Sequence, residues 1–509
     1  MSSIYAAIDT GSDKMGSEIS APPTSVYEDK LLDPKYPQTL PTTTIERVDS
    51  FGMNRSAVEY VWRPATISDL KSVFEIARTH GRKIGLRGAG RSYGDGSLSS
   101  ENICLELTRM NRILNWDPAT GVIEIEPGVT VRQLWQYCIG DGWWPPVVSG
   151  TMFVTMGGAL AMNFHGKNNF RMGPIGDHVL EFDLLTPSGE TLTCTRELNR
   201  DMFFAAIGGF GMLGCFTRIV LRMKQVESGL LEVYALATGN LAEMIREFEA
   251  RMDSADYLVG WIDCFARGSK LGRGQIHDAH YLHGAEDPDP AQTLRVENQE
   301  LPDTILGFVP KSIMWRLLSP VSNNFGMRLL NWAKYTASAT IGNGKTVRQS
   351  HAGFAFLLDY VPNWKFVYRP CGFIQYQSFI PAENAERCFT AQLTACHKCG
   401  IIPYLGVFKR HRRDDFLMTH SVDGYSLALD IPVTRRNSDG LTALTRQLNA
   451  IVLDSAGRFY FAKDSTLDSV TARSYLGEDA IAEFTRLKRL CDPDSLLQTD
   501  LSVRLFGEF

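Results

Sequence analysis

Two glycine-rich segments constrain the fold of this chain more than any other feature. Residues 88–95 read GAGRSYGD, and residues 149–168 carry further glycines among Ser, Thr, Asn and His side chains. Glycine permits positive φ and lets the backbone approach a ligand closely, so successive N–H groups can point at phosphate oxygens. Two such loops beside predicted strands can hold both phosphates of one dinucleotide. The pair therefore favours an enzyme that binds flavin adenine dinucleotide (FAD).

Length and charge narrow the class of protein. The chain has 509 residues, which is too long for one typical core and predicts two or more domains. Its net charge of −5 argues against binding to nucleic acid, which requires a basic surplus. The ten cysteines are scattered, so we expect them to be reduced. The C-x-x-C at residues 396–399 lacks the further ligands of a zinc site, and no metal is expected.

The N-terminal region is polar and mixed in charge. Residues 1–30 lack the apolar stretch of a signal peptide, and no segment approaches the ~20 apolar residues that cross a bilayer. We therefore expect a cytoplasmic protein whose contact with a membrane, if any, is peripheral. Residues 1–50, rich in Ser, Thr and Pro, predict a flexible N-terminal arm.

The order of predicted elements indicates an α+β fold. Apolar residues on one face predict a helix over residues 66–81, and Thr130 can cap a second helix that runs to residue 137. Alternation and turn residues predict strands at 83–87, 103–107 and 122–126, a hairpin over 179–195, and a second, antiparallel sheet from 373–380, 404–409 and 425–431. This is not the strict β-α-β alternation of a parallel nucleotide-binding sheet.

Residues 209–214 read GFGMLG, which matches the G-x-G-x-x-G pattern of dinucleotide-binding Rossmann folds. That interpretation requires a strand before the motif and a helix after it. Here residues 199–206 predict a helix before it, and the alternation in residues 216–224 predicts a strand after it. We therefore expect these glycines to form a close turn beneath the flavin rather than a site for NAD.

Five segments, in this order along the chain, resemble the vanillyl-alcohol oxidase and p-cresol methylhydroxylase (PCMH) superfamily of flavoenzymes. They are residues 90–95 (GRSYGD), 165–168 (HGKN), 372–377 (GFIQYQ), 407–409 (VFK) and 462–465 (AKDS). Within the superfamily the likeness is to the oxidases of a polyprenyl-phosphoryl ribose, and it covers roughly residues 60–509.

The resemblance implies a two-lobed, PCMH-type FAD-binding domain at residues 51–225 and again at 458–509. A substrate-binding (cap) domain with an antiparallel sheet would occupy residues 226–457. The implied reaction oxidises the ribose 2′-hydroxyl to a keto intermediate, which a separate NAD(P)H-dependent short-chain reductase then reduces. One departure is Ala428, where some relatives place a cysteine that faces the flavin.

The residues expected to hold FAD come from both glycine-rich loops and from later segments. They are Gly88, Ala89, Gly90, Arg91, Ser92, Tyr93, Gly150, Thr151, Thr155, Gly157, Gly158, Asn163, Gly166, Lys167, Asn168, Gly211, Gly214, Ile219 and Tyr460. Many superfamily members bond a histidine, directly before the loop serine, to the flavin. Here that position is Arg91, which stays protonated and cannot act as that nucleophile, so we predict noncovalent FAD.

Lys463 is the strongest catalytic candidate, because an ammonium beside the flavin stabilises its anionic reduced form. The alternative is a surface lysine paired with Asp464. Gln375 and Gln377 share one face of their strand, which suits the hydroxyls of a sugar, although a hydrogen-bonded sheet surface has the same pattern. His165 is expected either to orient the substrate or relay a proton, or to be structural.

Three further residues are expected to contact the substrate. Lys409 could bind a phosphate as a point charge, and Tyr60 and Trp261 could form ring walls, although aromatic residues are more often core. Residues 284–345 are expected to be mobile or membrane-facing. Within them, the window 301–335 combines many apolar side chains with basic ones, which predicts either a membrane patch or a substrate lid.

The sequence is also compatible with other functions. The chain could be an FAD-dependent oxidase of a free alditol or sugar lactone, or resemble a sterol Δ24-reductase. It could also be a flavin-binding partner subunit without activity, although Lys463 and the paired glutamines argue against lost chemistry.

Overall fold

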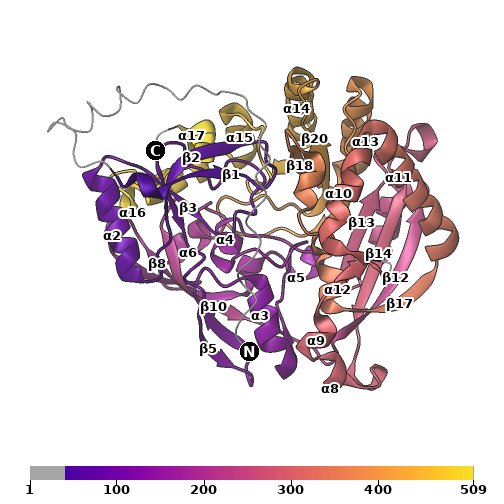
Figure 1. The fold of residues 1–509 in the computed structure, drawn as a ribbon, viewed down its shortest axis with the longest axis horizontal. Coiled ribbons are helices and arrows are strands. Elements are labelled where there is room, and N and C mark those ends of the chain that lie inside the picture. Colours follow the sequence, from indigo (N-terminus) through magenta and orange to yellow (C-terminus); the bar gives the residue numbers. More distant parts are fainter. Residues whose placement is uncertain (1–39, 306, 508–509) are drawn as a thin grey trace, which may run out of the picture.

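A computed structural model of the chain describes residues 40–305 and 307–507. Its fold is α+β and has two lobes (Figure 1). One lobe combines the N-terminal part of the chain with the C-terminal helices, and the other is built from the middle of the chain. Because the two ends of the chain meet in one lobe, the middle segment is an insertion between them.

The helices of the first lobe begin where the sequence places caps. Helix α2 (Ile67–Thr79) starts with a capping box between Thr66 and Asp69, and α3 (Val131–Cys138) starts with one between Thr130 and Gln133. Helix α2 buries Leu70, Val73, Phe74 and Ala77, which lie on the one apolar face that the sequence predicts. Both helix predictions are confirmed.

Two sheets complete the first lobe. The smaller has the order β1-β2-β4-β3, from β1 (Ile45–Asp49), β2 (Ser56–Trp62), β4 (Ile103–Glu106) and β3 (Ile84–Arg87). The larger is antiparallel, with the order β5-β6-β10-β8-β9, from β5 (Ile113–Asp117), β6 (Val122–Ile125), β10 (Cys215–Arg222), β8 (Val179–Leu185) and β9 (Thr191–Thr195). A two-stranded ribbon joins β7 (Trp143–Trp144) to β11 (Lys224–Gln225).

The expected flexible arm over residues 1–50 is wrong at its C-terminal end. Strand β1 pairs with β2 in antiparallel register, and Phe51 donates its backbone N–H to Ser92 O at 2.9 Å. The ladder therefore holds residues 45–49 in the sheet that carries the first glycine-rich loop. Residues 1–39 lie outside the described residues.

Three short helices of the first lobe lie within or after the second glycine-rich segment. They are α4 (Met156–Ala161), α5 (Asn169–Met172) and α6 (Arg200–Ala206). Helix α6 precedes the GFGMLG motif and strand β10 follows it, which confirms the order predicted from the sequence. The motif is therefore a helix-to-strand turn, in which Gly211 takes a positive φ of 78°.

The second lobe is built on an eight-stranded antiparallel sheet with the order β17-β12-β14-β13-β19-β20-β18-β21. Its strands are β12 (Leu230–Thr238), β13 (Tyr257–Ile262), β14 (Gly274–Tyr281), β17 (Lys345–Ser350), β18 (Phe373–Pro381), β19 (Leu405–His411), β20 (Gly424–Pro432) and β21 (Arg458–Phe459). Helices α7 (Leu241–Glu249), α13 (Ala382–Cys399) and α14 (Ser438–Leu453) pack against this sheet.

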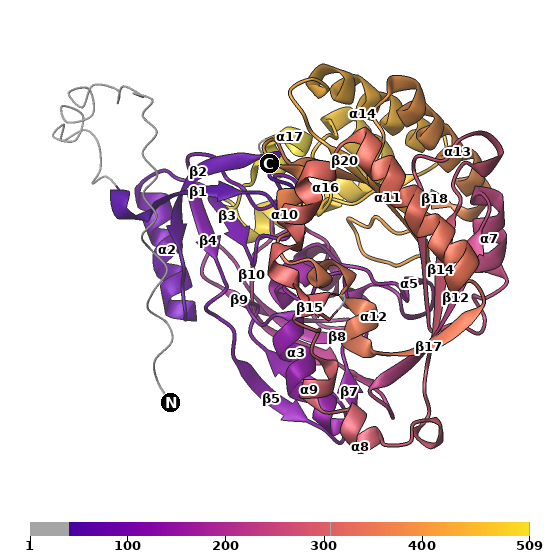
Figure 2. The ribbon, with the colours of Figure 1, turned by 45° about the vertical axis from the view of Figure 1, so that its right-hand side comes forward.

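The segment between β14 and β18 carries short helices and a small ribbon. They are α8 (Pro290–Thr293), α9 (Val296–Gln299), β15 (Thr304–Ile305), β16 (Val309–Pro310), α10 (Met314–Leu318), α11 (Asn324–Ala337) and α12 (His351–Ala355). Helix α11 runs along the strands of the large sheet (Figure 2). None of the helices within residues 40–305 and 307–507 is long and apolar enough to cross a bilayer.

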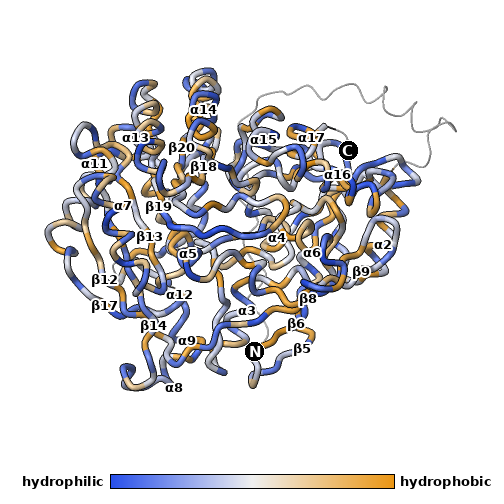
Figure 3. Tube along the Cα trace, turned by 180° about the vertical axis from the view of Figure 1, so that it is seen from behind, coloured by the Kyte–Doolittle hydropathy of each residue, from blue (hydrophilic) through white to orange (hydrophobic). Residues whose placement is uncertain are grey.

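The C-terminal segment returns to the first lobe through α15 (Ser469–Leu476), α16 (Glu478–Cys491) and α17 (Asp500–Phe506). Leu497 forms a parallel bridge with Ile84 of β3, and Arg504 of α17 forms ion pairs with Asp95 and Asp464. The segment after β19 also crosses between lobes: Figure 3 shows a long hydrophilic stretch there, and Arg412 binds Asp177 at 2.6 Å. The functional domain bounds themselves stay a prediction.

Candidate active site

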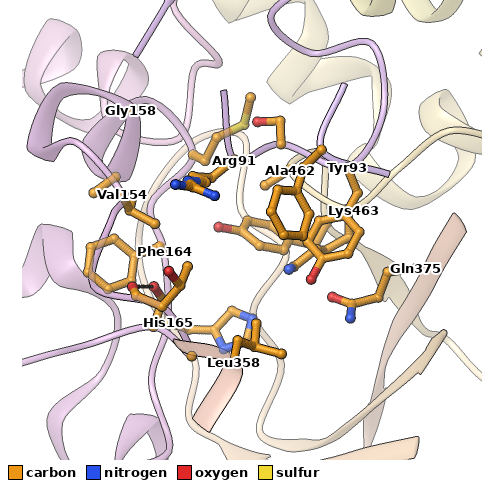
Figure 4. A pocket seen from close by; sticks show the side chains of 18 of the residues that line it. Arg91, Tyr93, Val154, Gly158, Phe164, His165, Leu358, Gln375, Ala462 and Lys463 are labelled. Atoms are coloured by element: carbon orange, nitrogen blue, oxygen red, sulfur yellow. Dashed lines mark hydrogen bonds between the residues drawn. The ribbon is translucent and has the colours of Figure 1, made fainter. Parts of the chain in front are cut away.

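A cavity of about 460 Å³ lies where the two lobes meet. Both glycine-rich loops line one part of it, and strands β13, β14, β18, β19 and β20 of the large sheet line another. Figure 4 shows side chains from both lobes arranged around this space, among them Arg91, His165 and Lys463. The cavity thus joins segments that are far apart in the sequence.

The first loop offers a row of free backbone donors. Among the described residues, no acceptor receives the N–H groups of residues 88–92. A side chain at position 88 is excluded, because its Cβ would lie 2.0 Å from Thr155 Oγ1 of the second loop. The close approach of the two loops therefore depends on glycine, and it leaves amide groups available to an anionic ligand.

The first loop also packs directly on the segment that carries Lys463. Tyr93 donates its backbone N–H to Ala462 O at 2.8 Å, and a Cβ on Gly94 would lie 1.8 Å from Asp464 O. Strand β21 ends at Phe459, and Lys463 lies in the turn after it, where its N–H bonds to Tyr460 O at 3.0 Å. That turn points the lysine into the cavity.

The ammonium of Lys463 lies 3.6 Å from the centre of the Tyr93 ring. Burial lowers the pKa of Lys463, and the carboxylate of Asp430 opposes that shift. The alternative pairing of Lys463 with Asp464 is not formed, because Asp464 pairs with Arg504 at 2.9 Å. Lys463 is therefore a lysine of the cavity lining, with its pKa lowered to about 7 by burial, rather than a surface lysine.

Gln375 and Gln377 both line the cavity from strand β18, and both are buried. Gln375 donates to Asp430 Oδ1 at 2.5 Å, and Gln377 donates to Ser426 Oγ at 3.2 Å. Both amides are held by their neighbours on β20, so each is oriented before a ligand arrives. Such preorganised polar groups can orient a substrate hydroxyl.

His165 packs in a cluster of rings behind the glutamines. Its ring centre lies 4.8 Å from that of His411 and 5.4 Å from that of His420, and Gln377 Nε2 lies 3.2 Å from His165 Nε2. Burial, reinforced by the charge of Lys409, lowers the pKa of His165 well below its ordinary value. The ring is therefore neutral near pH 7, which favours an orienting role over the expected proton relay.

Most of the residues singled out from the sequence line this one cavity. They are Gly88, Ala89, Gly90, Arg91, Ser92, Tyr93, Gly150, Thr151, Thr155, Gly157, Gly158, His165, Lys167, Gly211, Gly214, Trp261, Gln375, Gln377, Lys409, Tyr460 and Lys463. Lys167 lies at the sheet end rather than with the loops, because its Nζ donates to Phe354 O and its own carbonyl accepts from Leu258 of β13. Ala428 also lines the cavity.

Five predicted site residues do not line the cavity, and each has another role. Tyr60 lies in β2, where the guanidinium of Arg82 sits 5.6 Å from its ring centre. Ile219 is fully buried in β10.

The other three shape the backbone around the second loop. Asn163 accepts from Gly176 N at 3.0 Å, and Asn168 donates to Pro146 O at 2.8 Å. A Cβ on Gly166 would lie 2.9 Å from Val148 O. These residues fix the course of the loop without facing the space inside it.

Several lining residues were missed by sequence reasoning. Phe51, Arg87, His277, Lys334 and Trp364 all line the cavity. Arg87 directly precedes the first glycine-rich loop, and Lys334 lies in the window 301–335, but no motif marks Phe51, His277 or Trp364, which only the fold brings to this place. The alternation of β14 could have shown which residues share a face with His277, but not which face meets the cavity.

Comparison with known proteins agrees with this geometry. The family model described as "FAD binding domain" matches residues 58–195, which include both glycine-rich loops. The chain therefore carries an FAD-binding domain that resembles those of the PCMH-type FAD-linked oxidases, and it is an FAD-dependent oxidoreductase.

Among named relatives, the chain is similar to decaprenylphosphoryl-beta-D-ribose oxidase of Mycolicibacterium smegmatis. The two are 29% identical over 477 residues, which cover 91% of this chain and 98% of the relative. More limited likeness links it to a putative D-arabinono-1,4-lactone oxidase of Neurospora crassa, at 26% identity over 34% of this chain and 30% of that protein. Cytokinin dehydrogenase 3 of Arabidopsis thaliana is 25% identical over 39% of each chain.

The residues present fit FAD. The free N–H groups of residues 88–92 and the side chains of Arg87 and Arg91 supply donors and positive charge for its diphosphate. The buried Nε of Arg91 has no hydrogen-bond partner in the described part of the chain, and its guanidinium lies 5.6 Å and 5.5 Å from the ring centres of Phe51 and Phe153. A ligand with anionic oxygens would satisfy this donor.

We predict that FAD is held without a covalent bond. Arg91 occupies the position at which a histidine would form that bond, and a guanidinium is not a nucleophile at any accessible pH. Precipitating the purified protein with acid should release all flavin into the supernatant, as measured by absorbance and fluorescence. Flavin fluorescence on the denatured polypeptide in a gel would contradict the prediction.

Proposed function

We propose that this enzyme oxidises a secondary hydroxyl of a lipid-linked pentose, the 2′-hydroxyl of a polyprenyl-phosphoryl ribose, to a ketone. The observation that carries the proposal is the set of oriented amides beside an ammonium: Gln375, Gln377 and Lys463 face one space next to the glycine-rich loops. Paired amides suit the vicinal hydroxyls of a sugar ring. The relative whose name specifies a decaprenylphosphoryl ribose supports the same class of substrate.

When bound, FAD supplies the acceptor of two electrons and a proton from the carbinol carbon. The chain's own residues must place that carbon and manage charge. Gln375 and Gln377, locked by Asp430 and Ser426, hold hydroxyls in position. The hydroxyl proton leaves to solvent water, and the ammonium of Lys463 stabilises the negative charge that develops on the oxygen.

The neutral ring of His165 completes this arrangement. Its buried Nδ1 has no hydrogen-bond partner in residues 40–305 and 307–507, so it offers a polar contact to a ligand in the cavity. Phe379 and Tyr460 pack against the ring and fix its plane. The product ketone would be reduced by a separate NAD(P)H-dependent short-chain reductase, as in the polyprenyl-phosphoryl ribose oxidases that the sequence resembles.

Helix α11 argues for a substrate drawn from a membrane. Its side facing the sheet buries Met327 and Asn331, while its outer side exposes Phe325 (79%), Leu329 (54%) and Trp332 (53%). A soluble surface helix has the opposite pattern, with the apolar stripe turned inward. We therefore favour peripheral contact with a membrane at α11 over a closed substrate lid.

Charge and neighbouring residues support this assignment. Phe308, Leu317, Leu330 and Ile341 extend the apolar surface around α11, and Arg316, Arg328 and Lys345 lie in the same stretch of chain. Exposed apolar area combined with basic residues is the pattern that binds the interface of anionic bilayers. The same segment reaches the cavity, because Lys334 of α11 lines it.

Replacing Phe325 and Trp332 by Asp should remove binding to membranes. Burying each ring in lipid stabilises membrane binding by roughly 1.5–3 kcal/mol per side chain, and Asp cannot supply this. The partition of the protein onto vesicles should therefore fall by about tenfold or more. Co-sedimentation with vesicles of phosphatidylglycerol and phosphatidylcholine measures this. Leu490→Asp is the matched control, since Leu490 is 68% exposed but lies in α16, outside the segment that carries α11. Equal sedimentation of the double variant and the control would refute the patch.

Anaerobic titration tests the proposed reaction itself. Polyprenyl-phosphoryl ribose should bleach the flavin absorbance near ~450 nm, the band of an oxidised flavin, and yield a keto product by mass spectrometry. Reduction by a free alditol or sugar lactone, with none by the lipid-linked ribose, would overturn the proposal.

A further inference from the structure

The charge of the cavity lining is one-sided. It includes Arg87, Arg91, Lys167, Lys334, Lys409 and Lys463, while no Asp or Glu lines it within the described part of the chain. A cavity with walls of one sign focuses the electrostatic field and concentrates ions of the opposite sign. The lining therefore selects an anionic ligand, and the question is how many anionic groups it accommodates.

The cations divide into two groups by position. Arg87 and Arg91 belong to the first glycine-rich loop, where the FAD diphosphate would bind. Lys167, Lys334 and Lys409 lie with the large sheet. A diphosphate held by the loops leaves this second group without a counter-charge.

The sheet brings the second group together. Lys409 follows Phe408 of β19, which pairs with Gly260 of β13, and the preceding residue Val259 lies opposite His277 of β14. Both Val259 and His277 line the cavity. Burial lowers the pKa of His277 to about 4, and the charges of Lys167 and Lys334 add to that shift. His277 is therefore a neutral hydrogen-bonding group close to both lysines.

Helix α11 supplies Lys334 from above the sheet. Its Nζ lies 4.1 Å from the ring centre of Trp261, and no carboxylate lies within ion-pair distance in residues 40–305 and 307–507. Asn331 donates to Tyr404 O at 3.4 Å, and Ser338 after the helix donates to Gln275 Oε1 at 2.9 Å. The helix is thus tied to the sheet on both sides of Lys334.

Lys409 is also without a carboxylate partner. Burial lowers its pKa to about 8, and no acidic group opposes that shift in the described part of the chain. Charged groups that are removed from bulk water normally acquire a partner, because an unpaired buried charge is costly. In contrast, Lys463 has Asp430 nearby, and Lys167 has the carbonyl of Phe354. Lys409 is half-buried and Lys334 is exposed, and neither has an ion-pair partner in the described part of the chain.

We propose that Lys334, Lys409 and His277 form a phosphate-binding subsite at the sheet end of the cavity, separate from the loops that hold the FAD diphosphate. The ligand class is a phosphoryl group esterified to the substrate, and the site rests on the proposed function in that the phosphate belongs to the molecule being oxidised. Lysine binds phosphate as a point charge, and neutral histidine adds a donor. Since Lys334 is carried by α11, the phosphate is bound by the helix whose outer face meets the membrane.

Calorimetric titration of the FAD-loaded protein tests this subsite. Geranyl phosphate represents a lipid phosphate, ribose 5-phosphate a soluble sugar phosphate, and geraniol the uncharged chain. Lys334→Met and Lys409→Met should each weaken geranyl phosphate binding by about tenfold and leave geraniol unchanged, while Lys334→Arg retains most of the affinity. Lys71→Met is the matched control, because Lys71 is exposed on α2, outside the cavity, and its loss removes the same charge.

The outcomes separate cleanly. Three results would overturn the subsite. Both Met variants could bind geranyl phosphate within twofold of the wild type, they could lose affinity for geraniol as much as for geranyl phosphate, or the wild type could bind neither phosphate. If only ribose 5-phosphate depends on Lys334, the subsite stands and its phosphate comes from a soluble sugar. If the variants behave as expected but polyprenyl-phosphoryl ribose fails to reduce the flavin, the subsite stands and the proposed substrate is wrong. Melting curves of each variant exclude loss of folding.

Discussion

Replacing Lys463 by Ala is expected to slow flavin reduction by about 10²–10³-fold or more while FAD stays bound. The reason is that Lys463 is a cation held inside the cavity against the Tyr93 ring at 3.6 Å, next to the oriented amides. The expected diphosphate donors lie in the loops instead, so the cofactor should remain. Stopped-flow reduction measures the rate, and the ratio of flavin to protein absorbance measures the occupancy.

Two comparisons make this expectation specific. Lys270→Ala removes an exposed lysine outside the cavity and should change neither quantity. Lys463→Arg keeps a positive charge at every accessible pH, so a decline of the wild-type rate above the lowered pKa of Lys463 should be absent from the Arg variant. Near-normal reduction by the Ala variant would rule out the assigned role.

Replacing Arg504 by Met should destabilise the protein by about 3–5 kcal/mol. Arg504 forms ion pairs with Asp95 at 2.7 Å and Asp464 at 2.9 Å, and both carboxylates are buried. Removing the guanidinium leaves two buried carboxylates without this cation, although Asp464 keeps its backbone hydrogen bonds, and this is more costly than losing a surface ion pair. Asp95 belongs to the first glycine-rich loop and Asp464 follows Lys463, so FAD occupancy should fall as well.

Urea denaturation measures the free energy of unfolding of this variant. The matched control is Arg473→Met, which breaks an exposed pair with Glu478 at 3.0 Å and should cost at most about 1 kcal/mol. A loss below about 1 kcal/mol for Arg504→Met, with normal flavin content, would contradict the coupling between the C-terminal helix and the loops.

The contacts of Gly94 and Arg504 explain why the C-terminal segment must return to the first lobe. Gly94 of the loop approaches Asp464 O so closely that a Cβ there would lie at 1.8 Å. Arg504 then binds the carboxylates on both sides of that contact. Lys463, the lysine proposed to act in catalysis, is thereby placed by a helix near the C-terminus and by a loop from residues 88–95.

Local patterns in the sequence predicted much of this. Capping residues at Thr66 and Thr130 located two helices, and the order of helix and strand around residues 209–214 excluded a Rossmann motif. Glycine-rich loops indicated a dinucleotide, and the alternation in β18 placed Gln375 and Gln377 on one face. Each of these inferences depends on residues within a few positions of one another, where backbone geometry alone sets the outcome.

Other features depended on contacts between distant segments. The apolar window at residues 301–335 was evident from the sequence, but only the packing of α11 shows that Asn331 faces the sheet while Phe325 and Trp332 face solvent. Tyr60 is aromatic and could contact a sugar ring, yet it lies in β2 and does not line the cavity.

The sequence by itself determined the cofactor class and the element order, and it indicated candidates for the reactive side chains, because these follow from short-range chemistry. Only the tertiary structure decided the burial that lowers the pKa of His165, the pairing of Arg504 with two carboxylates, and, within the described residues, the lack of acids in the cavity lining around Lys334 and Lys409. The burial of a side chain and the electrostatic potential around it depend on all residues that surround it in space. Neighbours in space are set by the fold and not by position along the chain.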